Sequence, residues 1–388
     1  MPAKTSIRVT DASGNFLFET ASFLEIGNAP GLHYVLNCGQ IGAMTCTLGP
    51  EFNNRLPKDG RVHIMRSVNG GPAQREGESC FLIREWTYAD NYTTITAVHA
   101  NDLMRRRFIL YSGNNVGLTY VQFTATPGDN AIKTIWKQNA GSSIDLVHRA
   151  TNDEQATAYD DQEDISAYVS VQANVSAAPN VDLWIPWRNM LDVFFDIENM
   201  SYLLGTFLIA EIVAPTENTL ELRTYTGIRG VDRRFSTGNG LVFTPSRGNL
   251  ENSLLTVNAI EEVTLAQALG ADNGGGTWYR FAGAAQDNTR LFQSPLNRIE
   301  GIYDDNNAPA DGTLTNDSLA AVRAGRPVIT AIGDLVETDQ CIRGIDFNFG
   351  DLVTVQVAGV QYDMRLDVLD VTISGGTERT QARFQYNG

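Results

Sequence analysis

Short hydrophobic runs near both ends of the chain limit its possible folds more than any other feature. In the first hundred residues these runs are rich in β-branched and aromatic side chains, and turn sequences such as 11–14 (DASG) and 58–60 (KDG) separate them. Near the C-terminus, Val353, Val355 and Val357 alternate with polar residues in the same way. Short strands at this spacing predict small β-barrels or sandwiches at both ends of the chain.

The region between these blocks predicts a mixture of helices and strands. Residues 111–180 are polar and irregular. Pro186 suits the first turn of a helix, and apolar residues such as Met190 and Phe194 recur at helical spacing, which predicts a helix over 186–204. Three further features are expected: a hairpin over 207–226, a second irregular stretch over 270–315 and a short amphipathic helix over 318–324.

The predicted fold class is therefore mainly β with an α+β middle, in which two small β-barrel domains are accompanied by mixed insert domains. A domain can be discontinuous in sequence, so the boundaries are approximate. The expected domains are an N-terminal β-barrel (1–110), a mixed α/β middle domain (111–260), an irregular acidic connector (261–330) and a C-terminal β-barrel (331–388).

The charge of the chain is unevenly distributed. Its 45 acidic and 29 basic residues give a net charge of −16, which argues against a general nucleic-acid binder because such a protein needs a basic face. Residues 1–150 carry a net charge of +2 and residues 151–388 a net charge of −18. No apolar run reaches the ~18 residues of a membrane-spanning helix, and the first residues do not begin a signal peptide. We therefore expect synthesis in a cytoplasm and no membrane segment.

The sequence contains none of the common catalytic or metal-binding motifs. Its cysteines are widely spaced and its histidines lack metal-ligand spacing; His63 and His99 fall in expected strands, where structural roles are expected. Acidic clusters at 160–164 and 304–311 offer oxygen ligands for a hard cation but do not match the EF-hand spacing, and solvated charge is the simpler interpretation. We predict no catalytic, cofactor-binding or metal-ligating residue, no cofactor and no enzymatic activity.

Three consecutive arginines, Arg105, Arg106 and Arg107, follow the last expected strand of the N-terminal block. No aromatic residues are interleaved with them, so they match a nucleic-acid-binding patch poorly. We predict that they form salt bridges across a subunit contact, with ordinary surface charge as the alternative.

Three segments carry a resemblance in their order and spacing. Residues 95–107 (ITAVHANDLMRRR) read as a strand followed by D-L and R-R, and residues 220–233 (LELRTYTGIRGVDR) read as a strand followed by G and then D-R. Residues 349–355 (FGDLVTV) and 365–371 (RLDVLDV) form a G-D-x-V-T-V hairpin pattern. In this order the segments resemble the tail-hub proteins, also called baseplate-hub or tail-tip proteins, of long-tailed bacteriophages.

The resemblance implies a structural virion protein of a tail tip or baseplate, without catalysis. Three copies with two β-barrels each would form a ring that joins a six-fold tail tube or distal tail protein above to a three-fold spike, tip or fibre protein below. A tape-measure protein is a further implied partner, and DNA would pass through the ring without specific binding. Part of the acidic excess is expected to face this channel. The residues implied at the subunit interface are Arg105, Arg106, Arg107, Asp232, Arg233, Gly350 and Asp351.

Two other classes of function stay open at this stage. One is a receptor- or glycan-binding tail module, for which Trp184, Trp187 and Trp278 would serve as platforms. The other is a tail-associated cell-wall hydrolase that uses paired carboxylates, whose partnership is spatial and leaves no sequence motif.

Overall fold

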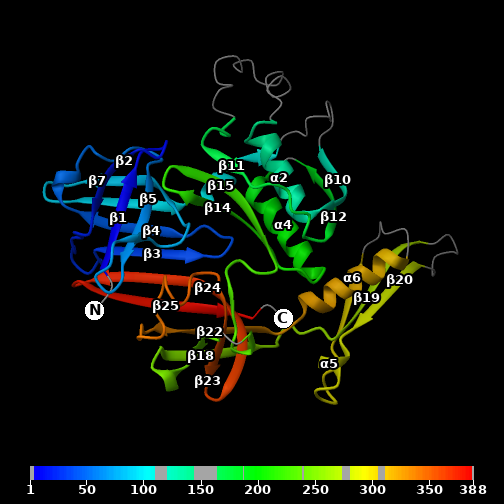
Figure 1. Cartoon of the computed structure of the whole chain (residues 1–388). Coiled ribbons are helices and arrows are strands. Elements are labelled where there is room, and N and C mark those ends of the chain that lie inside the picture. The colour runs from blue at the N-terminus through cyan, green and yellow to red at the C-terminus, as the bar shows by residue number, and fades with distance from the viewer. Residues whose placement is uncertain are drawn as a thin grey trace.

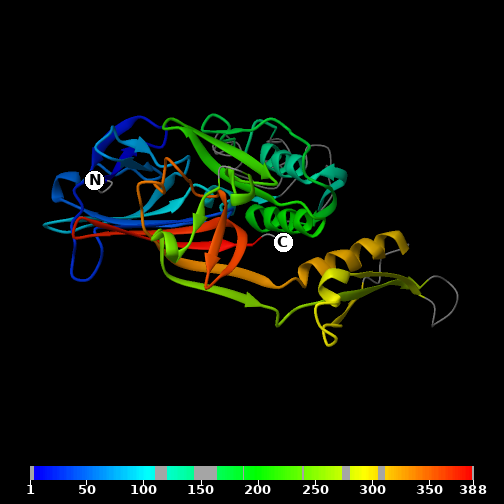
Figure 2. The ribbon, with the colours of Figure 1, turned by 60° about the horizontal axis from the view of Figure 1, so that its bottom comes forward.

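The computed structural model describes residues 4–109, 120–143, 164–186, 188–237, 240–272, 280–304 and 311–386. A large β-sheet occupies one side of the molecule, a mixed α/β unit packs against it, and a smaller α/β unit extends away from both (Figure 1). We call this last part, residues 260–326, the projecting unit; Figure 2 shows how far it stands from the sheet.

The N-terminal block forms an antiparallel arrangement in the order β3-β4-β8-β7-β5-β1-β2, with β6 beside β5. A single 3-10 turn, η1 (Pro50–Phe52), lies between β4 and β5. The strands are β1 (Lys4–Thr10), β2 (Phe16–Thr20), β3 (Leu32–Asn37), β4 (Ala43–Leu48), β5 (Arg61–Ser67), β6 (Gln74–Arg75), β7 (Phe81–Tyr88) and β8 (Thr93–His99).

The C-terminal block continues the same sheet in the order β18-β22-β25-β24, and β23 pairs with β24 to form a hairpin. Two short strands, β16 and β17, run parallel to β23. These elements are β16 (Asp232–Arg233), η4 (Phe235–Thr237), β17 (Val242–Phe243), η5 (Pro245–Arg247), β18 (Leu250–Asn258), β22 (Val328–Leu335), β23 (Leu352–Val357), β24 (Val360–Ser374) and β25 (Thr377–Gln385).

Strands β24 and β3 join the two blocks into one sheet of 15 strands. They are antiparallel, with Asp370 opposite Val35 and Leu369 opposite Leu36. The mainly β fold class is confirmed. The detail of two separate small barrels is not: in the described part of the chain no pairing closes a barrel, and the path of strands ends at β2 and β18. At the seam, β24 and β3 pair with each other, whereas in two separate closed barrels each would pair only within its own block.

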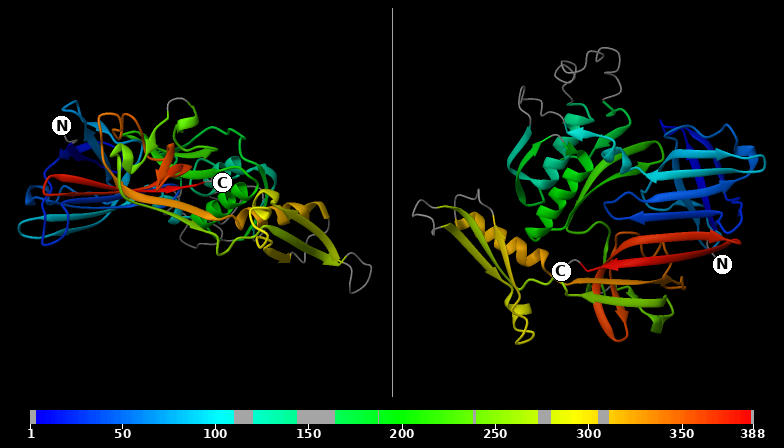
Figure 3. Two further views of the ribbon diagram at one scale, coloured as in Figure 1. Left: turned by 90° about the horizontal axis from the view of Figure 1, so that it is seen from below. Right: turned by 180° about the vertical axis from the view of Figure 1, so that it is seen from behind.

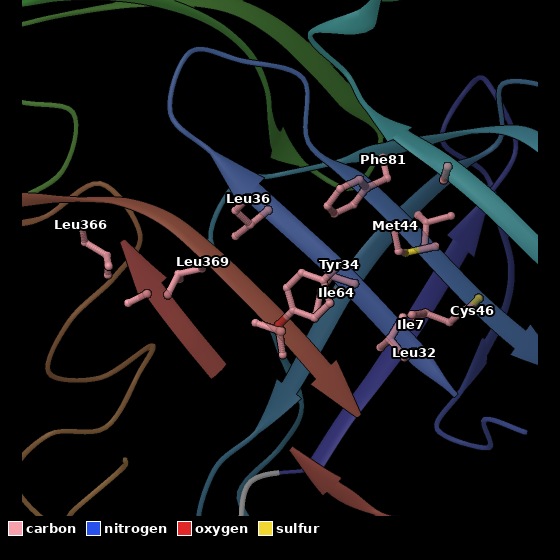
Figure 4. Close-up of a cluster of buried hydrophobic side chains, with 14 of the residues drawn as sticks. Ile7, Leu32, Tyr34, Leu36, Met44, Cys46, Ile64, Phe81, Leu366 and Leu369 are labelled. Atoms are coloured by element: carbon pink, nitrogen blue, oxygen red, sulfur yellow. The ribbon is translucent and has the colours of Figure 1, made fainter. Parts of the chain in front are cut away.

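One hydrophobic core crosses this seam. Alternation places Leu32, Tyr34 and Leu36 of β3 on the buried face. Figure 4 shows these side chains in one cluster with Leu366 and Leu369 of β24, and this cluster extends into both blocks. Residues from the two ends of the chain therefore fold around shared apolar contacts.

The mixed unit covers the N-terminal block on one side and has its own core. Its helices α2 and α4 pack together and against the hairpin of β14 and β15. The elements are α1 (Asp102–Arg105), β9 (Phe108–Ile109), β10 (Tyr120–Pro127), α2 (Gly128–Asn139), β11 (Val169–Val171), β12 (Asn180–Pro186), β13 (Arg188–Asn189), α4 (Met190–Leu203), β14 (Leu208–Thr216) and β15 (Thr219–Thr226).

Two expectations for this unit are corrected. Pro186 is not in a first helical turn: it ends β12, where it lies opposite Tyr120, and α4 begins at Met190 because the Asn189 side chain accepts a hydrogen bond from Leu191 N. Residues 111–180 are also less irregular than expected. They contain helix α2, whose buried residues Ala131, Ile132, Ile135 and Trp136 lie on one helical face.

The projecting unit is likewise ordered where an irregular connector is expected. Strand β19 pairs antiparallel with β20 and parallel with β21, and α6 covers one face. Gly283 lets α6 approach, because a Cβ there would lie 2.3 Å from Thr315 N, and Ser318 Oγ donates to Gly283 O at 2.9 Å. The elements are β19 (Leu265–Asp272), β20 (Arg280–Gln286), α5 (Asn288–Leu291), β21 (Glu300–Asp304) and α6 (Asp311–Ala324).

Val355 tests the shared core. Its side chain is 1% exposed in β23, so Val355→Asp buries an unpaired charge and should lower the free energy of unfolding by at least about 3 kcal/mol. Val360→Asp, at a 46% exposed position of the same hairpin, should change it by less than about 0.5 kcal/mol. Urea unfolding of both variants measures the difference, and equal effects would contradict the assignment of Val355 to the core.

Candidate functional site

Arg343 is the centre of a buried group of charges that connects the two blocks of the sheet. Its side chain is 2% exposed and forms ion pairs with Glu76, at 3.0 Å, and with Glu378. Arg66 of β5 reaches the same place, 2.6 Å from Glu337 and 3.3 Å from Glu378. We call these five residues the Arg343 network.

Neutral side chains complete the Arg343 network from the N-terminal strands. Tyr34 Oη donates to Glu76 at 2.6 Å, and Thr5 Oγ1 donates to Glu378 at 2.8 Å. Burial, together with the adjacent Glu76 carboxylate, raises the pKa of Tyr34 well above its ordinary value, so the phenol remains a donor. Strands β1, β3 and β5 are thus held to the loop that follows β22 and to β25.

The predicted interface residues Arg233, Gly350 and Asp351 lie together, where β16 runs parallel to β23. The Asp351 carboxylate accepts hydrogen bonds from Val231 N at 2.7 Å, Asn348 N at 2.8 Å and Arg233 Nε at 2.7 Å. Asp351 is 1% exposed, so these bonds stabilise the folded chain itself.

Gly350 is required by this arrangement. Its φ is +88°, and a Cβ would lie 2.6 Å from Arg229 Cδ. Asp232, the fourth residue of the motif, pairs instead with Arg234 at 2.6 Å. The structure therefore explains the G-D and D-R motifs by contacts within one chain, and their role at a subunit interface stays a prediction.

The three consecutive arginines do not act as one group. Arg105, 59% exposed, pairs with Asp102, and Arg106 pairs with Asp102 at 2.6 Å and with Asp59 at 2.8 Å. Arg107 lines a cavity between the N-terminal block and the mixed unit. A contact of these arginines with another subunit stays a prediction.

The residues considered for chemistry occupy structural positions. Burial lowers the pKa of His63 and of His99 to about 4, so both rings are neutral near pH 7. The cysteines are free and buried. No group of three His, Cys, Asp or Glu side chains in the described ranges is arranged to hold a metal ion. His148, Trp187, Trp278 and most of both acidic clusters lie outside the described residues.

One face of the large sheet is left open along eight strands, from β7 to β18, while the opposite face packs on the shared core. Seen from behind, no described helix crosses these strands (Figure 3, right). We call it the outer face, and threonine is its commonest residue. Its half-buried or exposed residues include Glu85, Thr87, Thr94, Thr96, Val98, Ala43, Thr45, His33, Val35, Asn37, Val368, Asp370, Thr372, Arg379, Gln381, Arg383, Val328, Thr330, Ile332, Glu251, Leu254 and Thr256.

Most charges on the outer face have partners: Arg379 pairs with Asp334 at 2.9 Å, Arg383 pairs with Asp367 at 2.9 Å, and His33 Nε2 lies 2.9 Å from Asp370. Glu85 of β7 and Glu251 of β18 lie on the same face, opposite Thr96 and Asp334; both are exposed and neither forms an ion pair with a described residue. This surface is therefore polar, with a small acidic excess.

Comparison with solved structures identifies the fold. The chain is similar to the 43 kDa tail protein of prophage MuSo2 from Shewanella oneidensis (TM-score 0.57, 10% identity, 98% of each chain covered). It is similar to a tail protein from Neisseria meningitidis MC58 (TM-score 0.55, 12% identity, 100% of this chain and 98% of that chain). It is also similar to the prophage tail protein gp18 of Listeria monocytogenes EGD-e (TM-score 0.53, 11% identity, 98% and 94%).

The chain therefore has the fold of phage tail proteins, as the sequence resemblance implies. No family model matches the sequence, and no curated protein is significantly similar to it in sequence. Among the described helices, none combines the length and the apolar character needed to cross a membrane.

Glu378 gives the Arg343 network a measurable pH dependence. Burial opposes its ionisation, but Arg343 and Arg66 favour it more, so its pKa lies below the ordinary 4.5. The resulting stabilisation is fully present above pH 4.5 and is lost as the pH falls through the lower folded-state pKa. Glu378→Gln should cost about 3 kcal/mol above this pH and progressively less below it.

The matched control is Glu300→Gln, which changes a pair whose partners are 57% and 60% exposed and should cost less than about 1 kcal/mol. Urea unfolding across the acidic range compares the two variants. A Glu378→Gln effect as small as that of Glu300→Gln would contradict the role of the Arg343 network.

Proposed function

We propose that the protein is a non-enzymatic structural component of a bacteriophage tail, the hub ring of its baseplate or tail tip. The observation that carries the proposal is the likeness of fold to phage tail proteins over nearly the whole length of each chain. In this role three copies form a ring in the virion between the tail tube or distal tail protein and a spike, tip or fibre protein. A tape-measure protein is a further candidate partner.

The strand order supports a ring of three. The outer face consists of two successive groups of four strands, β18-β22-β25-β24 and β3-β4-β8-β7, and every neighbouring pair is antiparallel. Three copies would present six such groups, which is the symmetry needed to continue a six-fold tube. The outer face is then the channel wall, past which DNA moves without specific binding.

The two ends of the outer face support contact between copies. No described strand pairs with the outer side of β18, or with segment 84–88 of β7 on the side away from β8. Val257 and Tyr88 lie at these edges on the core side of the sheet, yet they are 53% and 41% exposed. A second copy that continues the sheet would cover both side chains and satisfy both edges.

This arrangement has a consequence for charge. The outer face carries few acidic side chains; arginines pair with Asp334 and Asp367, whereas Glu85 and Glu251 are exposed without an ion pair to a described residue. If this face lines the channel, most of the acidic excess of residues 151–388 lies elsewhere, and the lining is only weakly acidic. The domain boundaries at 110, 260 and 330 are retained as part of the proposal, with the strands between 232 and 258 pairing with those of the C-terminal block.

Native mass spectrometry of the full chain, with electron microscopy of the same sample, tests the ring. The expected particle is a ring of three copies with an open centre. A monomer at high concentration that also fails to assemble with a tail-tube protein would overturn the proposal.

Val257→Lys tests the edge contact. An unpaired ammonium placed in a subunit contact should raise the dissociation constant of the trimer at least about tenfold, while the folded monomer is unaffected because Val257 is exposed there. Ile302→Lys, at a 78% exposed position of the projecting unit, is the matched control and should leave assembly unchanged. Equal assembly of the two variants would exclude β18 from the interface.

A further inference from the structure

A cavity of about 420 Å³ lies between the N-terminal block and the mixed unit. This volume is within the usual range for sites that bind small organic molecules. Its walls are largely apolar, with Leu82 from β7, Leu103 from α1 and Leu220 from β15, and Tyr168 is at its edge, 51% exposed. None of the functions considered above uses this cavity.

The polar part of the lining is positive, in a protein whose net charge is −16. Among the described residues of the lining, Arg61, Arg106 and Arg107 stand beside one carboxylate, that of Asp59. Asp59 is already paired, at 2.6 Å with Arg84 and at 2.8 Å with Arg106. The Asp59 carboxylate is therefore already neutralised by Arg84 and Arg106.

Arg61 forms no ion pair with a described carboxylate. It is 1% exposed, and Asp11 acts on it electrostatically without forming an ion pair. Its Nη2 donates to Ala12 O at 2.8 Å, whereas Nε and Nη1 have no hydrogen-bond partner among the described residues; neither has Arg106 Nη2. Buried guanidinium nitrogens are rarely left unsatisfied, and a bound ion or water at such a place is the usual explanation.

We infer that this cavity binds a monocarboxylate with an apolar body, its carboxylate beside Arg61 and its hydrocarbon part against the leucine walls. One unbalanced guanidinium calls for one negative charge, and guanidinium groups bind carboxylates well. A phosphate ester, with a charge of about −1.5 to −2, would place a second negative charge near Asp59. A free organic acid and the C-terminal carboxylate of a partner polypeptide share this chemistry.

Isothermal titration of the full chain tests the site with two probes. One is octanoate, with 1-octanol as its uncharged control; the other is a short peptide that ends in a free leucine carboxylate, with its amide as the control. At least one acid should bind with a dissociation constant below about 1 mM and at least about tenfold more tightly than its control. Binding of octanoate but not of the peptide would indicate that the ligand is a free organic acid. Binding of the peptide but not of octanoate would indicate that the ligand is the C-terminus of a polypeptide.

Variants separate the site from general stability. Arg61→Met should weaken binding at least about tenfold, whereas Arg84→Met, which removes a partner of Asp59 outside the lining, should not. Because Arg61 is buried, Tyr168→Glu and Tyr168→Lys give a second test at an exposed position: the first should weaken binding and the second should not. Failure of both acids to bind, equal binding of acid and control, or indifference to both Arg61→Met and Tyr168→Glu would overturn the inference.

Discussion

The seam between β3 and β24 is the constraint on which the rest of the structure depends. It joins strands that are more than 300 residues apart in the chain, with Val35 opposite Asp370. Its backbone hydrogen bonds each contribute only about 0.5–1.5 kcal/mol, and a slip by one residue would turn the buried face outward. The Arg343 network lies between the same two blocks and permits few registers, because Arg343 must meet both Glu76 and Glu378. Its main effect is therefore on specificity of pairing, since buried ion pairs add little net stability.

Local patterns explain how much of this fold the sequence could predict. Buried and half-buried residues alternate along β3, and in β23 the valines alternate with Thr354 and Gln356, so these strands can be predicted from the sequence. The seam between β3 and β24 could not be predicted, because alternation within a strand does not show which strand lies beside it. Helix α2 and the projecting unit could not be predicted for another reason. Polar and small residues surround their short apolar stripes. The strands of the projecting unit are also stabilised by contacts between distant segments, such as that of α6 with Gly283.

The same distinction between local patterns and long-range contacts applies to the candidate site. The sequence places Gly350 and Asp351 at a subunit interface, which stays a prediction. Within the chain, Gly350 leaves room for the Arg229 side chain, and the Asp351 carboxylate accepts hydrogen bonds from Val231, Asn348 and Arg233. Motifs that resemble those of tail hubs thus hold the joint between β16 and β23. The Arg343 network left no such signal, because its members are single residues scattered from Arg66 to Glu378. Only the fold brings them together.

The distribution of charge follows from these contacts. Many acidic side chains of the C-terminal half, such as Asp334, Asp351 and Asp367, are partners of arginines within the same half. The outer face consequently carries few charges without a partner, among them those of Glu85 and Glu251, over a width of eight strands. In the proposed ring, a DNA duplex would meet no unpaired arginine on this threonine-rich wall that could hold it, and acids act on it only within about 8 Å at physiological salt. A weakly acidic lining is therefore sufficient for passage without binding, and the rest of the acidic excess keeps other surfaces soluble and apart.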